Sequence, residues 1–293
     1  MVNYVTDFPA RPQRIGLFGA GRVAQQLAPA LLAAGHELAF LSSRTVASAA
    51  TLAAQLAPRP LVLTDFNAAL PAADVYLLAV PDAAVAPLLA AGRWPAGAVV
   101  AHVAGALPLS VFAAAPAVRG GVFYPLQTFS PGRAVAWNTV PFFIEGADAA
   151  TETLLLSLAR SLSAQVQILT SADRLRLHVG AVFANNFTNH LLGISHELLT
   201  EASLPFALLT PLIRETVDKA LSQAPFTVQT GPAVRRDAPT LAAHHAALAA
   251  HPAWQQLYGV LTTNIQAQQE VGQSGAAPPV PPPDPAEGPS LQP

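Results

Sequence analysis

The sequence predicts an α/β fold in which a doubly wound parallel sheet is followed by an all-helical domain. Short apolar runs alternate with helical patterns over residues 14–150, which is typical of βαβ units. A Gly-x-Gly-x-x-Ala stretch follows the first apolar run and opens the first helical pattern. From Thr151 onward the patterns are long and helical. We therefore expect the sheet in residues 14–150 and the helical domain in residues 151–272.

The apolar runs of the first half are short and bounded by turn residues, as expected for strands buried on both faces. They predict strands at 14–18, 37–41, 61–63, 74–80, 98–103, 122–125 and 142–145. Helical patterns lie between them at 22–34, 47–56, 83–91 and, as a short piece, 109–115.

The second half begins with a predicted helix at 151–162, followed by a lone strand at 166–169. Ser171 resembles an N-cap with Asp173 in the first turn, opening a helix that extends to Glu201. Further helices are predicted at 206–223, 240–250 and 252–269. Residues 1–13 form an N-terminal arm, and the Pro-rich residues 273–293 are expected to be disordered.

The composition limits the function classes. Of 293 residues, 52% are hydrophobic and 11% charged, so large apolar surfaces must be buried and a homo-oligomer is expected. The formal net charge is −2 and no Lys/Arg cluster occurs, which argues against a nucleic-acid partner. The chain has no cysteine and no persuasive histidine set, so neither a disulfide nor a metal site is predicted.

Membrane and export signals are weak. Residues 1–14 have neither the basic start nor the apolar core of a signal peptide, so we expect a cytoplasmic protein. Residues 94–118 carry no charge, but prolines and glycines interrupt them. We interpret this stretch as a strand, a turn and a short helix, not as a membrane span.

The glycine stretch has the strand–turn–helix context of a dinucleotide-binding fingerprint. Gly19 permits the tight turn, Gly21 lets a pyrophosphate approach the backbone, and Ala24 lets the helix pack close to the strand. The predicted cofactor-binding residues of the turn are Gly19, Ala20, Gly21, Arg22 and Val23. The alternative is a glycine turn that binds nothing.

The end of the second predicted strand indicates which dinucleotide binds. NAD sites carry Asp or Glu about 20 residues after the glycines, to hold the ribose hydroxyls. Here Ser42, Ser43 and Arg44 stand there instead. A guanidinium with neighbouring hydroxyls suits a 2′-phosphate, so NADP(H) is the predicted cofactor. The alternative is a solvated arginine after a strand.

The stretch "DVYLLAVPD" ends the fourth predicted strand at the carboxyl edge of the sheet. Val80, Pro81 and Asp82 are expected near the nicotinamide ribose. Pro81 and Asp82 also suit a turn and N-cap for the next helix, and both interpretations can hold together.

Hydride transfer to a carbonyl or imine needs a hydrogen-bond donor or general acid at the reacting atom. On the long predicted helix Asn186 and His190 are four residues apart and share a face. Beside them Phe183 and Phe187 form an apolar face. The competing interpretation is a set of core amides and histidines whose polar atoms are satisfied by backbone or a partner subunit.

Other polar residues occur in apolar surroundings. His102 ends a predicted strand and is a third candidate for catalysis, or a histidine bonded to backbone. Arg235 is a candidate for a substrate anion, or a local partner of Asp237 that helps cap the next helix. The remaining candidate substrate residues follow the strand at 122–125 and are Gln127, Thr128 and Ser130.

Several segments together carry a family resemblance: "GLFGAGRVA", "SSR", "AVPD", "HVAG", "YPLQTFS", "HVGAVFANNFTNH" and "TGPAVRRDAPTLAAHH". Over about Arg14–Gly272 the chain resembles Rossmann-like proteins with the C-terminal domain of unknown function 2520. These are relatives of deazaflavin-dependent NADP oxidoreductases, pyrroline-5-carboxylate reductases and 6-phosphogluconate dehydrogenase-type enzymes. The resemblance implies a nucleotide-binding domain, a helical domain that dimerises, and an active site between them.

Two departures from related patterns bear on the chemistry. Hydroxyacid dehydrogenases of the wider superfamily place a lysine one turn before an asparagine, whereas Val182 precedes Asn186 here. Related members often carry histidine before "PLQTF", whereas this chain has Tyr124, which weakens any role that the resemblance assigns to that position.

The sequence thus predicts an NADP(H)-dependent oxidoreductase. Hydride would pass to or from a small carbonyl, hydroxy-acid or imine substrate in the interdomain cleft. Asn186 would orient the substrate, and His190 or His102 would handle the proton. The alternatives are an NADP(H)-binding sensor or assembly protein without turnover and, third, a deazaflavin-linked reaction.

Overall fold

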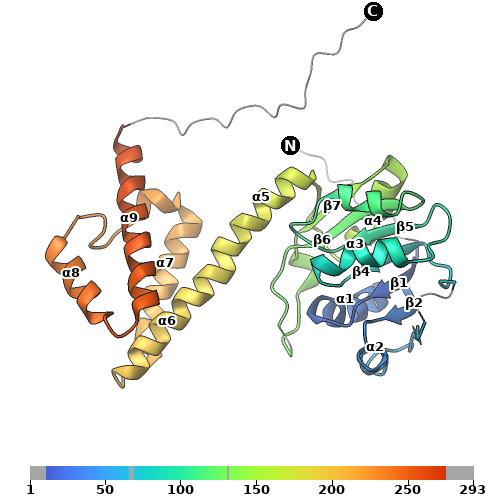
Figure 1. Ribbon diagram of the computed structural model, residues 1–293, viewed down its shortest axis with the longest axis horizontal. Coiled ribbons are helices and arrows are strands. Elements are labelled where there is room, and N and C mark those ends of the chain that lie inside the picture. Colours follow the sequence, from blue (N-terminus) through green and yellow to red (C-terminus); the bar gives the residue numbers. More distant parts are fainter. Residues whose placement is uncertain (1–10, 66–68, 131, 275–293) are drawn as a thin grey trace, which may run out of the picture. The chain divides into compact units, whose positions relative to one another are not determined.

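The computed structural model describes residues 11–65, 69–130 and 132–274 (Figure 1). The chain divides into two compact units, residues 1–188 and 189–293, and each is considered by itself. Of the predicted N-terminal arm only residues 11–13 are described, and of the predicted Pro-rich tail only residues 273 and 274. The rest of both segments lies outside the described residues.

The first unit is built on a sheet with the strand order β3-β2-β1-β4-β5-β6-β7-β8. Because the chain starts near the middle and winds first to one edge and then to the other, the predicted doubly wound fold is confirmed. The strands are β1 (Arg14–Phe18), β2 (Glu37–Ser42), β3 (Leu61–Val62), β4 (Val75–Leu78), β5 (Val99–His102), β6 (Arg119–Pro125), β7 (Phe142–Gly146) and β8 (Val166–Ile168).

The sheet is parallel from β3 to β6, and β7 then pairs antiparallel with β6. β8 runs parallel to β7, so the last two strands are reversed relative to the others. The sequence predicted these segments as strands but not their reversal.

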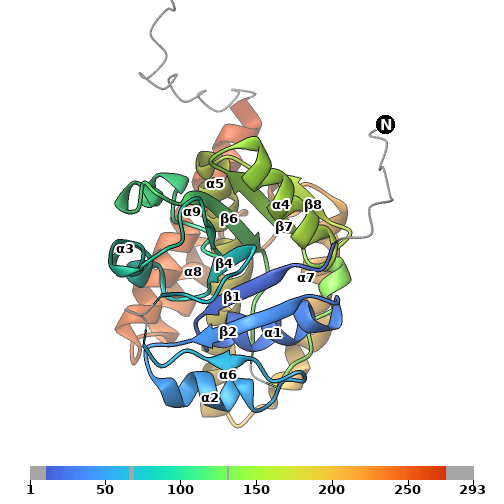
Figure 2. The same cartoon turned by 90° about the vertical axis from the view of Figure 1, so that its right-hand side faces the viewer.

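Helices cover both faces of this sheet (Figure 2). One core cluster joins α1, α2 and α4 to alternate strand residues such as Leu17 and Leu77. The other core cluster joins α3 and η1 to the strand residues that alternate with these, such as Phe18 of β1 and Tyr76 of β4. The helices are α1 (Arg22–Ala33), α2 (Val46–Ala53), α3 (Asp82–Ala91), α4 (Ala149–Arg160) and the 3₁₀ segments η1 (Leu109–Ala114) and η2 (Trp137–Thr139).

Residues 151–170 follow the predicted domain boundary, yet they form most of α4 and all of β8 in the first unit. Asp148 caps α4 by accepting a hydrogen bond from the Thr151 amide, 2.9 Å away. α4 buries Leu155 and Leu158 against the sheet. The sheet therefore continues some twenty residues beyond the change in sequence character.

The long helix predicted after β8 is continuous but not uniform. It comprises α5 (Ser171–Ala181), a π-helical segment η3 (Val182–Phe187) and α6 (Thr188–Glu201). The predicted N-cap at Ser171 is wrong, because Thr170 caps the helix and its hydroxyl accepts from the Asp173 amide. π-helical turns are rare and occur frequently at functional sites.

The described part of the second unit, up to residue 274, continues from α6 with helices only. They are the 3₁₀ segments η4 (Phe206–Leu209) and η5 (Pro225–Val228) and the helices α7 (Thr210–Ser222), α8 (Ala238–Ala247) and α9 (Pro252–Ser274). Ala233 and Leu248 are the only buried hydrophobic residues among its described side chains. None of the described helices of the chain is long and apolar enough to span a membrane.

Candidate functional site

The glycine turn after β1 has the backbone that the fingerprint requires. Gly19 has φ +117°, and a β-carbon there would lie 2.0 Å from the carbonyl oxygen of Ala79. Its amide donates to the carbonyl oxygen of Ser42, 2.7 Å away. Only glycine fits, because both the dihedral angle and the contact with the end of β4 exclude a side chain.

Gly21 differs from Gly19 in its surroundings and in its backbone conformation. It is the N-cap of α1, has an ordinary φ of −79°, and lacks a side-chain cap. A β-carbon at Gly21 would meet nothing within 4 Å. The fold therefore does not require glycine at this position. The amides of the first helical turn have no intrahelical acceptor, and they offer hydrogen bonds and a positive dipole to an anion.

The helix behind this turn packs as predicted. Ala24 is fully buried between α1 and the sheet, while Arg22 at the start of α1 is exposed. Neither the first turn of α1 nor that of α2 carries an acidic residue. Nothing in these two turns would repel a phosphate.

The end of β2 presents the residues predicted to select the 2′-phosphate. Ser42 is 7% exposed, so it serves the turn through its backbone. Ser43 is half-buried, while Arg44 and Thr45 are exposed directly before α2. Arg44 forms no ion pair with any described residue. Its guanidinium is available to a ligand.

A small depression adjoins these elements. Its volume is about 190 Å³, and it is lined by Ala20, Gln25, Ser48, Thr51, Leu52 and Gln55 from the turn, α1 and α2. Gln25 donates to the Ala20 carbonyl across its floor, at 3.1 Å. The predicted phosphate-binding turn thus borders a hollow that continues toward α2.

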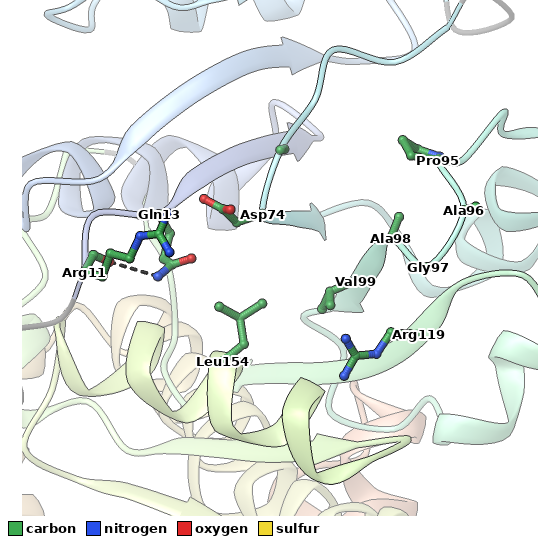
Figure 3. A pocket seen from close by; sticks show the side chains of 11 residues that line it. Arg11, Gln13, Asp74, Pro95, Ala96, Gly97, Ala98, Val99, Arg119 and Leu154 are labelled. Carbon is green, nitrogen blue, oxygen red and sulfur yellow. Dashed lines mark hydrogen bonds between the residues drawn. The ribbon is translucent and has the colours of Figure 1, made fainter.

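A larger cavity of about 430 Å³ lies at the opposite, amino edge of the sheet (Figure 3). It is lined by residues at the starts of strands, among them Gln13, Asp74 and Arg119. It shares no residue with the glycine turn. Open α/β sheets bind ligands at their carboxyl edge, so the position of this cavity is not the one that the fingerprint predicts for the cofactor.

Val80, Pro81 and Asp82 follow β4 at the carboxyl edge of the sheet. The Ala79 amide donates to Phe18 at 2.7 Å, which keeps the end of β4 beside that of β1. Val80 is half-buried, while Pro81 and Asp82 are exposed. Pro81 is the N-cap of α3 and Asp82 its first residue, so the interpretation of these two residues as a helix start is confirmed.

His102 lies at the end of β5 and is fully buried. Its Nδ1 accepts from the Ala104 amide at 3.2 Å, and its ring stacks on Phe112. Burial and the nearby Arg174 lower the pKa of His102 to about 3. This neutral, enclosed ring argues against proton donation by His102 and favours the backbone-bonded alternative.

The other sequence candidates are exposed. Gln127, Thr128 and Ser130 follow β6, and Gln127 accepts from the Thr128 amide at 2.8 Å. In the second unit the exposed Arg235 lies 3.9 Å from Asp237, which caps α8. That contact is the local ion pair weighed as its alternative.

Asn186 lies in the π-helical segment η3 and is exposed, as is Asn185 beside it. Phe183 and Phe187 pack edge-to-face 5.0 Å apart and stay 64% and 48% exposed, which gives the predicted apolar face beside the amides. His190 follows in α6 of the second unit and is exposed as well. Neither Asn186 nor His190 makes a hydrogen bond to a residue distant in sequence within the described chain.

A polar cluster at the start of α5 was missed. Tyr124 of β6 bonds to His178 of α5, and Arg174 of α5 pairs with Glu145 of β7. The one available signal was Arg174, four residues before His178 in the same predicted helix. Their partners come from strands 29 and 54 residues away, which no local pattern identifies.

An open α/β sheet with this glycine turn at its carboxyl edge defines a dinucleotide-binding protein. Residues 14–105 match the family described as "NADP oxidoreductase coenzyme F420-dependent", and residues 140–265 match the domain of unknown function 2520. The "putative NADP oxidoreductase BF3122" of Bacteroides fragilis is 38% identical, with a TM-score of 0.80 over 88% of this chain and 99% of that one. The chain belongs to this family of NADP oxidoreductases.

More distant structures share the fold. Protein TM1727 of Thermotoga maritima is 19% identical, with a TM-score of 0.69 over 87% of this chain and 99% of that one. A reductive aminase of Aspergillus terreus, solved with NADPH and ethyl-5-oxohexanoate, is 18% identical, with a TM-score of 0.61 over 90% and 95%. No protein of curated function matches the sequence.

The family assignment confirms NADP(H), the cofactor predicted from the end of β2. The residues of this chain fit it, since Gly21 leaves space at the start of α1 and the exposed Arg44 before α2 has no ion pair with the residues that the structure describes. Among the described residues no group of three or more His, Asp or Glu side chains could hold a metal ion.

Proposed function

We propose that this member of the family reduces a small substrate carrying a C=O or C=N bond, or oxidises the corresponding hydroxy acid or amine, with NADP(H). The observation that carries the proposal is the open N-terminus of α1 at Gly21, with the exposed Arg44 at the end of β2. When bound, the cofactor supplies or accepts the hydride. The similar fold of a reductive aminase supports the substrate class.

Asn186 is proposed to orient the substrate. It is exposed in η3, the π-helical segment that also carries the apolar pair Phe183 and Phe187, and π-helical turns occur frequently at functional sites. A carboxamide both donates and accepts hydrogen bonds, so it can hold a carbonyl or an amine in one orientation. The exposed residues after β6, Gln127, Thr128 and Ser130, are proposed to contact the substrate's polar end.

The test combines binding with turnover. Fluorescence titration of the full chain is expected to give tighter binding of NADPH than of NADH. Oxidation of NADPH is then followed at 340 nm with three probes: 2-oxoisovalerate, cyclohexanone and 1-pyrroline. Turnover of at least one probe supports the reductase. Tight NADPH binding with no turnover of any probe would favour the sensor function instead.

We also propose that the helical unit forms a homodimer with a second copy of the chain. Large apolar side chains stay exposed on its helices, including Leu208 at 61%, Leu212 at 63% and Leu221 at 83%. Only Ala233 and Leu248 are buried hydrophobics among the described residues of this unit. So little internal core leaves most of its apolar surface to be covered by a partner.

Light scattering coupled to gel filtration tests the dimer. The wild-type chain is expected at twice its 30.3 kDa mass. A Leu208→Ser, Leu212→Ser double variant is expected to shift toward the monomer, because polar side chains weaken an apolar interface. A Leu61→Ser variant, which changes an exposed leucine of the first unit, serves as control. A monomeric wild type would refute the dimer.

A further inference from the structure

Tyr124 and His178 form a close pair at the carboxyl end of β6. The tyrosine hydroxyl lies 3.0 Å from Nδ1 of His178, and the two rings meet edge-on with centroids 6.0 Å apart. A β-carbon at Gly105 would lie 2.4 Å from His178 Nδ1 and 2.8 Å from Tyr124 Cζ. The loop after β5 thus approaches the pair as closely as glycine allows.

Buried charges fix the helix that carries His178. Arg174, one turn earlier on α5, is 1% exposed and donates to the Glu145 carboxylate and to the Leu107 carbonyl. Glu145 also accepts from the Ser171 amide at 3.0 Å and from its hydroxyl at 2.7 Å. The first turn of α5 is therefore tied to β7 and to the loop before η1, which sets the position of His178 against Tyr124.

The pair lies on the edge of the sheet where the cofactor turn lies. β1, β4, β5 and β6 are parallel, so Tyr124 at the end of β6 shares an edge with Gly19 after β1. Burial raises the pKa of Tyr124, Arg174 lowers it, and Asp82 at the start of α3 raises it. The phenol therefore keeps its proton at neutral pH. Asp82, which contributes to this shift, is also predicted to lie near the nicotinamide ribose.

We propose that Tyr124 is the proton donor of this reductase and that His178 is its positioning residue, an assignment that rests on the function proposed above. With Nδ1 protonated, His178 donates to the phenol oxygen and leaves the hydroxyl proton free for the substrate. As hydride from NADPH forms the new C–H bond, the π pair moves to the substrate oxygen or nitrogen, which takes the Tyr124 proton. The His178 N–H stabilises the phenolate until water returns a proton to it.

The structure distinguishes Tyr124 from His102 and His190, the two histidines that the sequence suggested for the proton. His102 is fully buried and its pKa is about 3, whereas Tyr124 is 8% exposed and carries a hydroxyl proton 3.0 Å from Nδ1 of His178. His190 lies in the second compact unit and forms no ion pair with the described residues. Of these three described candidates, Tyr124 combines a position fixed by its bond to His178 with a proton to give.

The test uses the full chain, NADPH and whichever of the three probes is turned over. Tyr124→Phe is expected to lower kcat about 100-fold or more, with little change in KM or in NADPH affinity. Tyr258→Phe is the matched control, because Tyr258 bonds His244 at 2.9 Å in the same edge-on manner. Its kcat should stay within about twofold of wild type, since Tyr258 belongs to the second compact unit and has no part in the proposed proton transfer.

His178 is tested by rescue. His178→Leu should lower kcat with an unchanged KM, whereas His178→Asn should recover much of it, because the amide places a polar atom where Nδ1 was. If Tyr124→Phe does not fold, the kcat values of His178→Leu and His178→Asn test the proposed proton donor instead. A merely structural role would move thermal stability and KM but would not separate the Leu and Asn variants in kcat.

Three outcomes would overturn the assignment, and they are distinct. If the wild type is active and Tyr124→Phe keeps its kcat, Tyr124 is not the proton donor, while the proposed reductase function stands. A larger loss of kcat in His190→Gln than in Tyr124→Phe assigns the proton to His190. A wild type that binds NADPH yet turns over none of the probes refutes the reductase itself, and this assignment with it.

Discussion

Arg174 of α5 and Glu145 of β7 form an ion pair in which the arginine side chain is 1% exposed and the glutamate 18%. The pair joins β7, the strand that runs antiparallel to β6, to the first turn of α5. Removing one partner of such a pair leaves the other charge buried without compensation.

Arg174→Leu is therefore expected to lower the free energy of unfolding of the first unit by about 3–5 kcal/mol. Urea unfolding followed by tryptophan fluorescence measures it. The double variant Arg174→Met, Glu145→Met should cost less than the single change, because no lone charge remains. A loss below about 1 kcal/mol in Arg174→Leu would contradict a buried, paired arginine.

The Gly21→Ala variant is expected to change the affinity for NADPH much more than the stability of the fold. A β-carbon there meets nothing within 4 Å, so stability should change by no more than about 1 kcal/mol, the scale of an N-cap change. NADPH affinity should fall at least tenfold, because the methyl group occupies the approach of the pyrophosphate.

Isothermal titration with NADPH and a thermal melt measure the two effects. Gly35→Ala is the control at the other end of α1, where φ is +86° and the space is open. It should lose stability through backbone strain and keep its affinity. Unchanged affinity in Gly21→Ala would move the pyrophosphate away from this turn.

Arg44→Ala should weaken NADPH binding by about 1.5–3 kcal/mol, the range for hydrogen bonds to charged groups, and leave NADH binding unchanged. The reason is that only NADPH carries the 2′-phosphate. Arg59→Ala, also exposed but beyond the other end of α2, is the control. Equal losses for the two nucleotides would show that Arg44 does not read the 2′-phosphate.

The buried His102 predicts that acid destabilises the first unit. The pKa of His102 is about 3 in the fold, against an ordinary value of 6.5, so the unfolded chain takes up the proton first. The stability is complete above pH 6.5 and declines as the pH falls below it, by at most about 1.4 kcal/mol per pH unit. Burial lowers the pKa of His36 too, which adds in the same direction.

Urea midpoints at pH 7.5 and pH 5 measure this dependence. His102→Gln should reduce the slope, because an amide does not titrate, while His36 keeps part of it. A slope identical to wild type would mean that the imidazole of His102 is not held neutral by the fold.

Local sequence was enough for most of the first unit. The strands β1, β2 and β7 begin at the residues predicted from apolar runs, and α1 begins at the predicted Arg22. The glycine turn was also predictable, because Gly19 and Ala24 meet requirements of the backbone and of close packing within one βαβ unit. Such features depend on residues near one another in the chain.

Other features depended on which surfaces meet. β7 and β8 were predicted as strands, but their direction was set by the antiparallel pairing of β7 with β6 and the parallel pairing of β8 with β7. Ser171 has the residue type of an N-cap, yet its hydroxyl bonds Glu145, and Thr170 caps α5. The π-helical turn at η3 likewise interrupts a pattern that predicts an uninterrupted α-helix.

The sequence by itself determined the doubly wound fold, the family and the cofactor, because periodicity, glycine positions and the residue after β2 act over short stretches of chain. Only the tertiary structure decided which polar side chains meet. Tyr124 and His178 are 54 residues apart and share no sequence pattern, and they meet because β6 and α5 pack around Gly105. The same packing enclosed His102, since a side chain's exposure depends on its neighbours in space rather than in sequence.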